Sequence, residues 1–184
     1  IEIGEKRKNI LYPIKIKLCL NCKTALQESN VDKKLLFPSN YHYRAKNTKD
    51  VVNGMKKLVN EILKNYGSLK NKKVLDIGCN DGSLLDFFME YGAITFGFEP
   101  TDASKSAKNN GHTIFNEYFT FELANKFLYN YGKPDIITFT NVFAHIDNLP
   151  ELLNNLKLII KENDTLLVIE NHYLGSVIKY NQFD

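Results

Sequence analysis

The sequence predicts an α/β fold with a doubly wound, mainly parallel sheet, preceded by a small irregular module. Between residues 73 and 171, five short apolar runs alternate with segments whose apolar residues recur at helical spacing. The apolar runs are rich in Ile, Leu, Val and Phe, which is typical of parallel strands buried on both faces. The front of the chain lacks this alternation. We therefore expect a small module over residues 1–47 and an α/β domain over residues 48–184.

The expected helices and strands follow one another without an internal repeat. An amphipathic helix is predicted over residues 50–66, with Gly67 as its stop. Strands are expected at 73–78, 94–100, 112–115, 135–141 and 165–171, and helices at 83–92, 102–111, 120–132 and 150–162. Asp102 and Thr120 are suited to cap two of these helices, and Pro150 suits a first helical turn.

The composition of the chain argues against a membrane-spanning, secreted or disulfide-stabilised protein. No apolar run approaches the length of a membrane span, and the start of the chain lacks a charged-then-apolar leader. We therefore expect a cytoplasmic protein without membrane contact. Three cysteines are too few and too uneven for a disulfide framework. The chain begins at Ile1 rather than Met, which indicates a processed or trimmed product.

The net charge of +3 conceals an asymmetry between the two parts of the chain. Residues 1–73 carry 17 Lys and Arg against 6 Asp and Glu, whereas residues 74–184 carry 7 against 15. A basic front half favours an anionic partner such as nucleic acid or a nucleotide-activated sugar. A solvated, lysine-rich surface explains the same counts.

The stretch VLDIGCNDGS, residues 74–83, is a strand that continues into a glycine-containing loop. A triphosphate-binding loop needs a Lys-Ser/Thr pair after its second glycine, but Gly82 is followed by Ser-Leu. A dinucleotide-binding loop needs a glycine where Asn80 stands, and a third glycine later. One remaining option is S-adenosylmethionine, which carries an amino acid where a dinucleotide carries phosphates. The alternative is that the glycines only make a tight turn.

Acidic residues at two strand ends fit such a ligand. Asp76 can pair with the positive charge of S-adenosylmethionine. The backbone of Gly78 and Gly82 is expected to leave space for this ligand. Glu99, at the end of the second strand, can accept hydrogen bonds from both ribose hydroxyls. Cys79 is interpreted as a small packing residue of the loop rather than a nucleophile.

These features resemble the first motif and the acidic second-strand end of class I S-adenosylmethionine-dependent methyltransferases, which have a Rossmann-like fold. GFEPT (97–101), TNVFAHIDNL (140–149) and ENHYLGSVIKYNQFD (170–184) look like the sugar C-methyltransferases. The resemblance implies methylation of a ring carbon in a nucleotide-linked deoxy-ketosugar, through an enolate. The expected cofactor-binding residues are Asp76, Gly78, Cys79, Asn80, Gly82, Glu99, Pro100, Asn116, Glu117 and Asn141.

Three polar residues are candidates for the chemistry. Asn141 and His145 follow the fourth strand, at the carboxyl edge where doubly wound sheets place ligands. By resemblance both contact the sugar, and His145 is an oxyanion donor or auxiliary acid–base. A histidine on a helix surface is the alternative. His172 lies in a polar group after the fifth strand, where loop capping is the alternative role.

The resemblance also implies segments beyond Asp184. After a stretch like NQFD, that family continues into a Tyr-His-Glu-His segment, which supplies the catalytic base, and a second α/β domain. Without them, the chain is expected to be a cofactor-binding fragment that is catalytically incomplete. The sheet would then end in an exposed edge that permits self-association.

The front module contains a CxxC motif. LYPIKIKLCLNC, residues 11–22, predicts a strand that enters a knuckle formed by Cys19 and Cys22. By resemblance this motif and SNYHY (39–43) end a zinc-binding module, so the module is expected to be a zinc-ribbon-like remnant. Tetrahedral zinc needs four ligands, so the cysteines supply half a site, with His42 as a candidate third ligand.

An RNA methyltransferase is the rival enzyme. Its basic, CxxC-bearing front half would be the nucleic-acid platform. However, the fourth strand ends in TNVFAH, without the Asn/Asp-Pro-Pro-aromatic run of enzymes that methylate base amines. The basic residues are also scattered, with little aromatic interleaving. We therefore expect a nucleotide-linked sugar as partner and no nucleic acid.

Overall fold

A computed structural model describes residues 11–181 of the chain. The chain divides into two compact units, Ile1–Pro38 and Ser39–Asp184. The division falls earlier than the boundary expected after residue 47. The physical reason is that residues 39–47 form hydrogen bonds with loops of the α/β unit, although they precede its first long helix.

The described part of the first unit is a hairpin followed by a short helix. Strands β1 (Ile16–Leu18) and β2 (Ala25–Gln27) pair antiparallel, and helix α1 spans Lys33–Leu36. The strand expected over residues 11–22 is reduced to β1, because the turn begins at Cys19, whose carbonyl accepts a hydrogen bond from the Lys23 amide.

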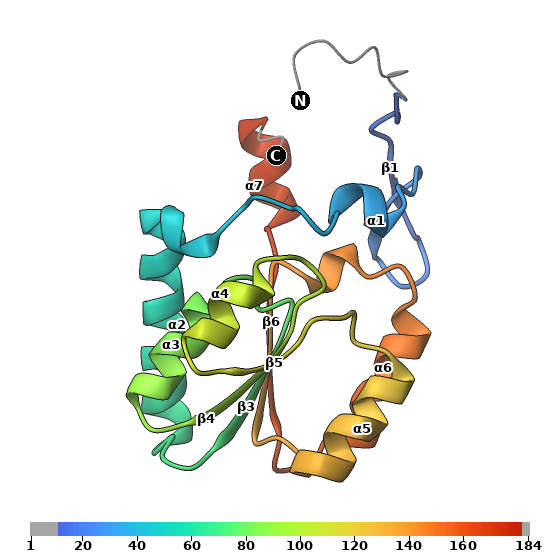
Figure 1. The fold of residues 1–184 in the computed structure, drawn as a ribbon. Coiled ribbons are helices and arrows are strands. Elements are labelled where there is room, and N and C mark those ends of the chain that lie inside the picture. Colours follow the sequence, from blue (N-terminus) through green and yellow to red (C-terminus); the bar gives the residue numbers. More distant parts are fainter. Residues whose placement is uncertain (1–10, 182–184) are drawn as a thin grey trace. The chain divides into compact units, whose positions relative to one another are not determined.

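The second unit contains a parallel sheet of five strands in the order β5-β4-β3-β6-β7 (Figure 1). The strands are β3 (Lys73–Ile77), β4 (Ile94–Phe98), β5 (Thr113–Phe115), β6 (Ile136–Thr140) and β7 (Leu166–Glu170). The chain starts in the centre at β3, moves to one edge and then returns to build the other half. This topology confirms the predicted doubly wound fold, a class of fold in which ligands bind outside the carboxyl ends of the central strands.

Helices cover both faces of this sheet (Figure 1). One face carries α2 (Lys49–Tyr66), α3 (Ser83–Glu90) and α4 (Ser104–Asn109), and the other carries α5 (Phe121–Tyr131) and α6 (Leu149–Ile159). Helix α7 (Leu174–Tyr180), which was not predicted, follows β7. Two short 3-10 helices, η1 (Ala45–Asn47) and η2 (Phe143–His145), lie in loops. Among residues 11–181, no helix is long and apolar enough to cross a membrane.

The helix ends agree with the predicted signals, with one exception. Thr120 caps α5 by accepting a hydrogen bond from the Leu123 amide. Asp102 does not cap α4, because the helix begins two residues later and its carboxylate pairs with Lys105 at 2.7 Å. The hydroxyl of Thr101 instead accepts the hydrogen bond at this turn.

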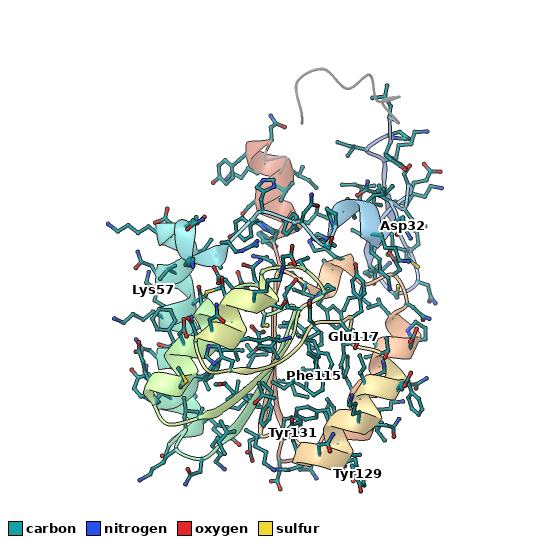
Figure 2. The ribbon with its side chains drawn as sticks, viewed as in Figure 1. Asp32, Lys57, Phe115, Glu117, Tyr129 and Tyr131 are labelled. Carbon is teal, nitrogen blue, oxygen red and sulfur yellow. The ribbon has the colours of Figure 1, made fainter. Side chains whose placement is uncertain are left out.

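Aromatic side chains fill the core between the sheet and α5. Phe115 and Tyr131 meet edge to face, with ring centroids 6.2 Å apart (Figure 2). Phe127, one turn earlier on α5, is fully buried. Tyr129, on the opposite side of α5, is 91% exposed, so only one side of this helix packs against the sheet. This packing fixes β4 and β5, whose ends carry candidate site residues.

Candidate cofactor-binding site

The ends of β3 and β4 meet through hydrogen bonds. The amides of Gly78 and Cys79 donate to the Phe98 carbonyl at 2.8 and 3.1 Å. The amide of Asn80 donates to Oε2 of Glu99 at 3.0 Å. The glycine loop and the acidic strand end, which the sequence places 19 residues apart, therefore form one structural unit.

Glu99 is 5% exposed, and donors of the protein reach both of its carboxylate oxygens. Oε1 accepts hydrogen bonds from the amide and the hydroxyl of Thr101, at 2.8 and 2.6 Å. Sequence reasoning missed Thr101, although a threonine two residues after a carboxylate is a common local hydrogen-bonding pattern. Ribose hydroxyls would have to share Glu99 with these donors or displace them.

Asp76 is buried at the end of β3, with 1% of its surface exposed. Its Oδ1 accepts a hydrogen bond from the Thr138 hydroxyl at 2.7 Å. Burial raises the pKa of Asp76 to about 7, with the Thr138 hydrogen bond opposing this shift and the charge of Glu99 adding to it. No ion pair within residues 11–181 neutralises Asp76. The strand ends therefore favour a cationic ligand.

The two glycines of the loop are required by the backbone conformation and by close packing. Both have positive φ, 78° at Gly78 and 84° at Gly82, which favours glycine. A Cβ at Gly78 would collide with Val142, and one at Gly82 would lie 2.8 Å from Cδ2 of His112. The space on the Cβ side of each glycine is thus filled by the protein, and the expected approach of a ligand to the loop backbone stays a prediction.

Cys79 packs inside the loop. Its side chain is 4% exposed, and its sulfur occupies the space above Gly97, where no Cβ could be accommodated. Burial, followed by the charges of Asp76 and Glu99, raises the pKa of this thiol well above its usual range. A neutral, enclosed thiol agrees with a packing role and not with a nucleophile.

Asn116, one of the expected cofactor-binding residues, holds the end of β4 in place. The side-chain amide of Asn116 donates to the carbonyls of Glu99 and Thr101, at 2.8 and 3.1 Å. Glu117 follows β5 and is exposed (Figure 2). Pro100, directly after Glu99, is half-buried.

The candidate sugar-side residues lie at the same edge, after β6 and β7. Asn141 has a φ of 54°, and its amide donates to the Glu170 carbonyl at 2.9 Å, which joins the two strand ends. His145 ends the 3-10 helix η2, and His172 lies between β7 and α7. Asn141, His145 and His172 all reach the surface.

His145 and His172 lie close enough to interact electrostatically. Neighbouring atoms shield the His145 ring from part of the solvent, and this desolvation, with the charge of His172, lowers the pKa of His145. His145 is therefore neutral near pH 7. A neutral imidazole can donate one hydrogen bond and accept another, which suits an acid–base or oxyanion-binding role.

Cys19 and Cys22 lie in the turn between β1 and β2. The sulfur of Cys22 is 3.3 Å from the Thr24 hydroxyl, and this hydrogen bond is the main cause that lowers the pKa of Cys22 to about 7. Within residues 11–181, no group of three or more metal-binding side chains is present. The two thiols suit zinc, but they do not fill its four coordination positions, so the described residues do not form a complete zinc site.

A family model described as "Methyltransferase domain" matches residues 43–180, which is most of the chain. The chain belongs to this methyltransferase family. The class is that of the S-adenosylmethionine-dependent class I enzymes, as the resemblance in the sequence implied.

Curated relatives include enzymes that methylate carbon and enzymes that methylate oxygen. The C-methyltransferase NovU of Streptomyces niveus is 26% identical over 175 residues, which cover 95% of this chain and 41% of NovU. A ubiquinone biosynthesis O-methyltransferase of Haemophilus ducreyi is 29% identical over 60% of this chain and 52% of its own length. The chain thus spans about half, or less, of the curated relatives it matches.

Solved structures of methyltransferases share the fold. The plantazolicin methyltransferase BpumL, in complex with a desmethylPZN analog and SAH, has a TM-score of 0.54 and 17% identity, covering 72% of this chain and 51% of its own. Magnesium protoporphyrin IX methyltransferase from Synechocystis PCC 6803 with bound SAH has a TM-score of 0.50 and 18% identity, covering 71% and 60%. At these identities the likeness concerns the fold.

Proposed function

We propose that this chain provides the cofactor-binding core of a methyltransferase that methylates a carbon atom of a nucleotide-linked deoxy-ketosugar. The observation that supports the cofactor is the meeting of Glu99 with the Asn80 amide at the ends of β3 and β4. The similarity to NovU supports carbon as the acceptor, because it extends over 95% of the chain, against 60% for the O-methyltransferase of H. ducreyi.

In this proposal the acidic strand ends hold S-adenosylmethionine. Asp76 and Glu99 supply a negative potential that favours the ammonium and sulfonium groups. Glu99 accepts hydrogen bonds from the ribose hydroxyls, as acidic strand ends do for nucleotides in related sheets. Asn116 and Glu117 border the adenine ring, and Asn141 closes the site from β6. When bound, the cofactor supplies the methyl group.

Carbon methylation requires an acidified C–H bond beside a ketone. A base removes the proton, and the bonding electrons pass to the ketone oxygen as an enolate. The enolate carbon then takes the methyl group, and the electrons of the broken bond stay with the sulfur. In this proposal the ring of His145 and the side-chain amide of Asn141 donate hydrogen bonds to the enolate oxygen, with His172 close to His145.

The remaining expectations stay proposals that the same fold motivates. We propose that the first unit is the end of a zinc-binding module and that the enzyme is cytoplasmic.

We also propose that β7, an edge strand of the sheet, pairs with a further strand or with a second copy of the chain. Leu167 and Ile169 on this edge strand are 38% and 41% exposed. Sedimentation analysis at rising concentration would detect a dimer, and a monomer throughout would contradict self-association.

The function is tested by incubating the chain with ¹³C-methyl-labelled S-adenosylmethionine and a nucleotide-linked deoxy-ketosugar. NMR distinguishes a new carbon-bound methyl from an oxygen-bound one, and the proposal predicts the former. An oxygen-bound methyl, or label in RNA added to a parallel sample, would contradict it. Cofactor binding without any transfer would identify the chain as a catalytically incomplete fragment.

A further inference from the structure

Residues 39–47, which we call the strap, connect two loops of the site across the carboxyl edge of the sheet. At one end, the Ser39 carbonyl accepts a hydrogen bond from the Asp102 amide at 2.7 Å, in the turn after β4. At the other end, the amides of Ala45 and Lys46 donate to side chains of the loop after β3, both at 3.1 Å. The strap therefore runs between the two strand ends that form the candidate cofactor site.

Asn80 joins the strap to Glu99. Its Oδ1 accepts the hydrogen bond from Ala45, and its Nδ2 donates to the Tyr43 carbonyl at 3.2 Å. Its own amide is the donor to Glu99 at 3.0 Å. Asn80 has a φ of 50°, a left-handed conformation that asparagine tolerates better than most residues. One residue thus uses its side chain for the strap and its backbone for the proposed ribose-binding carboxylate.

Asp81 is the second anchor of the strap. Its side chain is buried, with 1% exposed, and both carboxylate oxygens accept hydrogen bonds. Oδ1 accepts from the amide and hydroxyl of Ser83 at the start of α3, at 3.2 and 2.6 Å, while Oδ2 accepts from the Lys46 amide. One oxygen of this buried carboxylate therefore binds the start of α3, and the other binds the strap.

We propose that Asn80 and Asp81 are positioning residues that hold the strap closed over the site, so that strap closure and cofactor binding stabilise each other. The proposal rests on the proposed cofactor role of Glu99. Since Asn80 contacts both the strap and Glu99, a displacement of the strap disturbs the donor that orients this carboxylate. By linkage, a ligand held by Glu99 favours the closed strap to the same degree.

Asp81→Asn isolates the strap contact. The replacement is isosteric and keeps an oxygen for Ser83, but it places an NH₂ group against the Lys46 amide. Loss of one hydrogen bond to a buried carboxylate should raise strap opening about tenfold. Asp102→Asn is the matched control, because it removes a carboxylate that pairs with Lys105 and leaves the backbone bond of Asp102 to Ser39.

The experiment is hydrogen exchange of the strap amides in the 184-residue chain, alone and with S-adenosylhomocysteine, together with stopped-flow dissociation of that ligand. In the wild type, the ligand should add protection at Ala45 and Lys46. In Asp81→Asn, exchange at these amides and ligand dissociation should both be faster by about tenfold, a fold-change that corresponds to loss of one charged hydrogen bond. Asp102→Asn should match the wild type in both measurements.

Unchanged exchange in Asp81→Asn would overturn the anchoring of the strap. Faster exchange with unchanged ligand dissociation would overturn its coupling to the cofactor. A wild-type chain that does not bind the ligand would instead contradict the proposed function, and the coupling with it, while exchange in the free chain would still decide whether Asp81 anchors the strap.

Discussion

At the amino-terminal edge of the central sheet, Asp135 lies among cations, whereas Asp76 at the carboxyl edge forms no ion pair with any residue that the structure describes. Oδ2 of Asp135 accepts the Lys73 amide and Oδ1 pairs with Lys161, both at 2.8 Å. Partial burial raises the pKa of Asp135, but Lys161, the Lys73 amide and Lys72 together hold it below its usual range. This carboxylate is stabilised by the protein itself.

Asp76 is the opposite case. Burial raises the pKa of Asp76 to about 7, because no cation among the described residues offsets the cost of burying its charge. A protein that needed only stability would pair this group with a cation or replace it by an apolar residue. The difference between the two edges agrees with the proposal that the amino edge serves the fold and the carboxyl edge binds a cationic ligand.

Two glycines at opposite edges of the sheet show the same contrast, and their substitution gives the largest expected effect on stability. Gly82→Ala at the carboxyl edge should lower the free energy of unfolding by about 2–5 kcal/mol, because left-handed strain adds to the overpacking of His112 and Ala107. Gly92→Ala at the amino edge has the same positive φ, but its Cβ meets Lys70 only at 3.6 Å. Urea denaturation of Gly92→Ala should therefore show a loss of about 1–2 kcal/mol in the free energy of unfolding, because only backbone strain contributes. Equal losses would remove the packing role of Gly82.

Asp135→Ala should lower the free energy of unfolding by about 1–3 kcal/mol, because the half-buried Lys73 amide and Lys161 lose their acceptor. Denaturation at pH 7 measures this loss. The contribution of Asp135 is present above its unfolded pKa and disappears as pH falls through its lowered folded pKa. A variant with normal stability at pH 7 would contradict the structural role.

Asp76→Asn should change the pH dependence of stability, by on the order of 1 kcal/mol for each unit of pKa shift. The folded pKa of Asp76 is raised, so its favourable contribution is complete below about pH 4 and is lost as pH rises through about 7. The asparagine keeps the acceptor for Thr138 and does not titrate. Melting curves should show the variant gaining stability relative to the wild type between about pH 4 and about pH 7. A stability difference between the variant and the wild type that does not change with pH would show that Asp76 is not the group that titrates.

The sequence predicted the strands of the sheet because each is a short, mainly apolar run, and it predicted most helix ends because their signals are local. Thr120, Pro150 and Gly67 act within one turn of the helix they bound. Asp102 failed as a cap because Thr101, held by Glu99, took over that turn. A contact between two elements outweighed a local preference.

The site was predictable in its residue types and not in their contacts. Glu99 and the loop were expected to lie together, since carboxyl ends of parallel strands share an edge. The partner of Asp76, Thr138, is 62 residues away, and the strap is 35 residues from Asn80 and Asp81. Contacts between residues so far apart in the chain produce no periodic pattern in the sequence, so they could not be predicted. The contacts that Val142 and His112 make near Gly78 and Gly82 were unpredictable for the same reason.

The central claim is that acidic residues at the carboxyl edge bind an adenosyl ligand. It is tested most directly by calorimetric titration of S-adenosylhomocysteine into the wild type, Glu99→Gln and Asp135→Asn at pH 8. We predict that Glu99→Gln weakens binding by about tenfold or more, as for loss of a hydrogen-bonded charged partner, while Asp135→Asn binds like the wild type. Equal affinity in all three chains, or no binding to the wild type, would contradict the account.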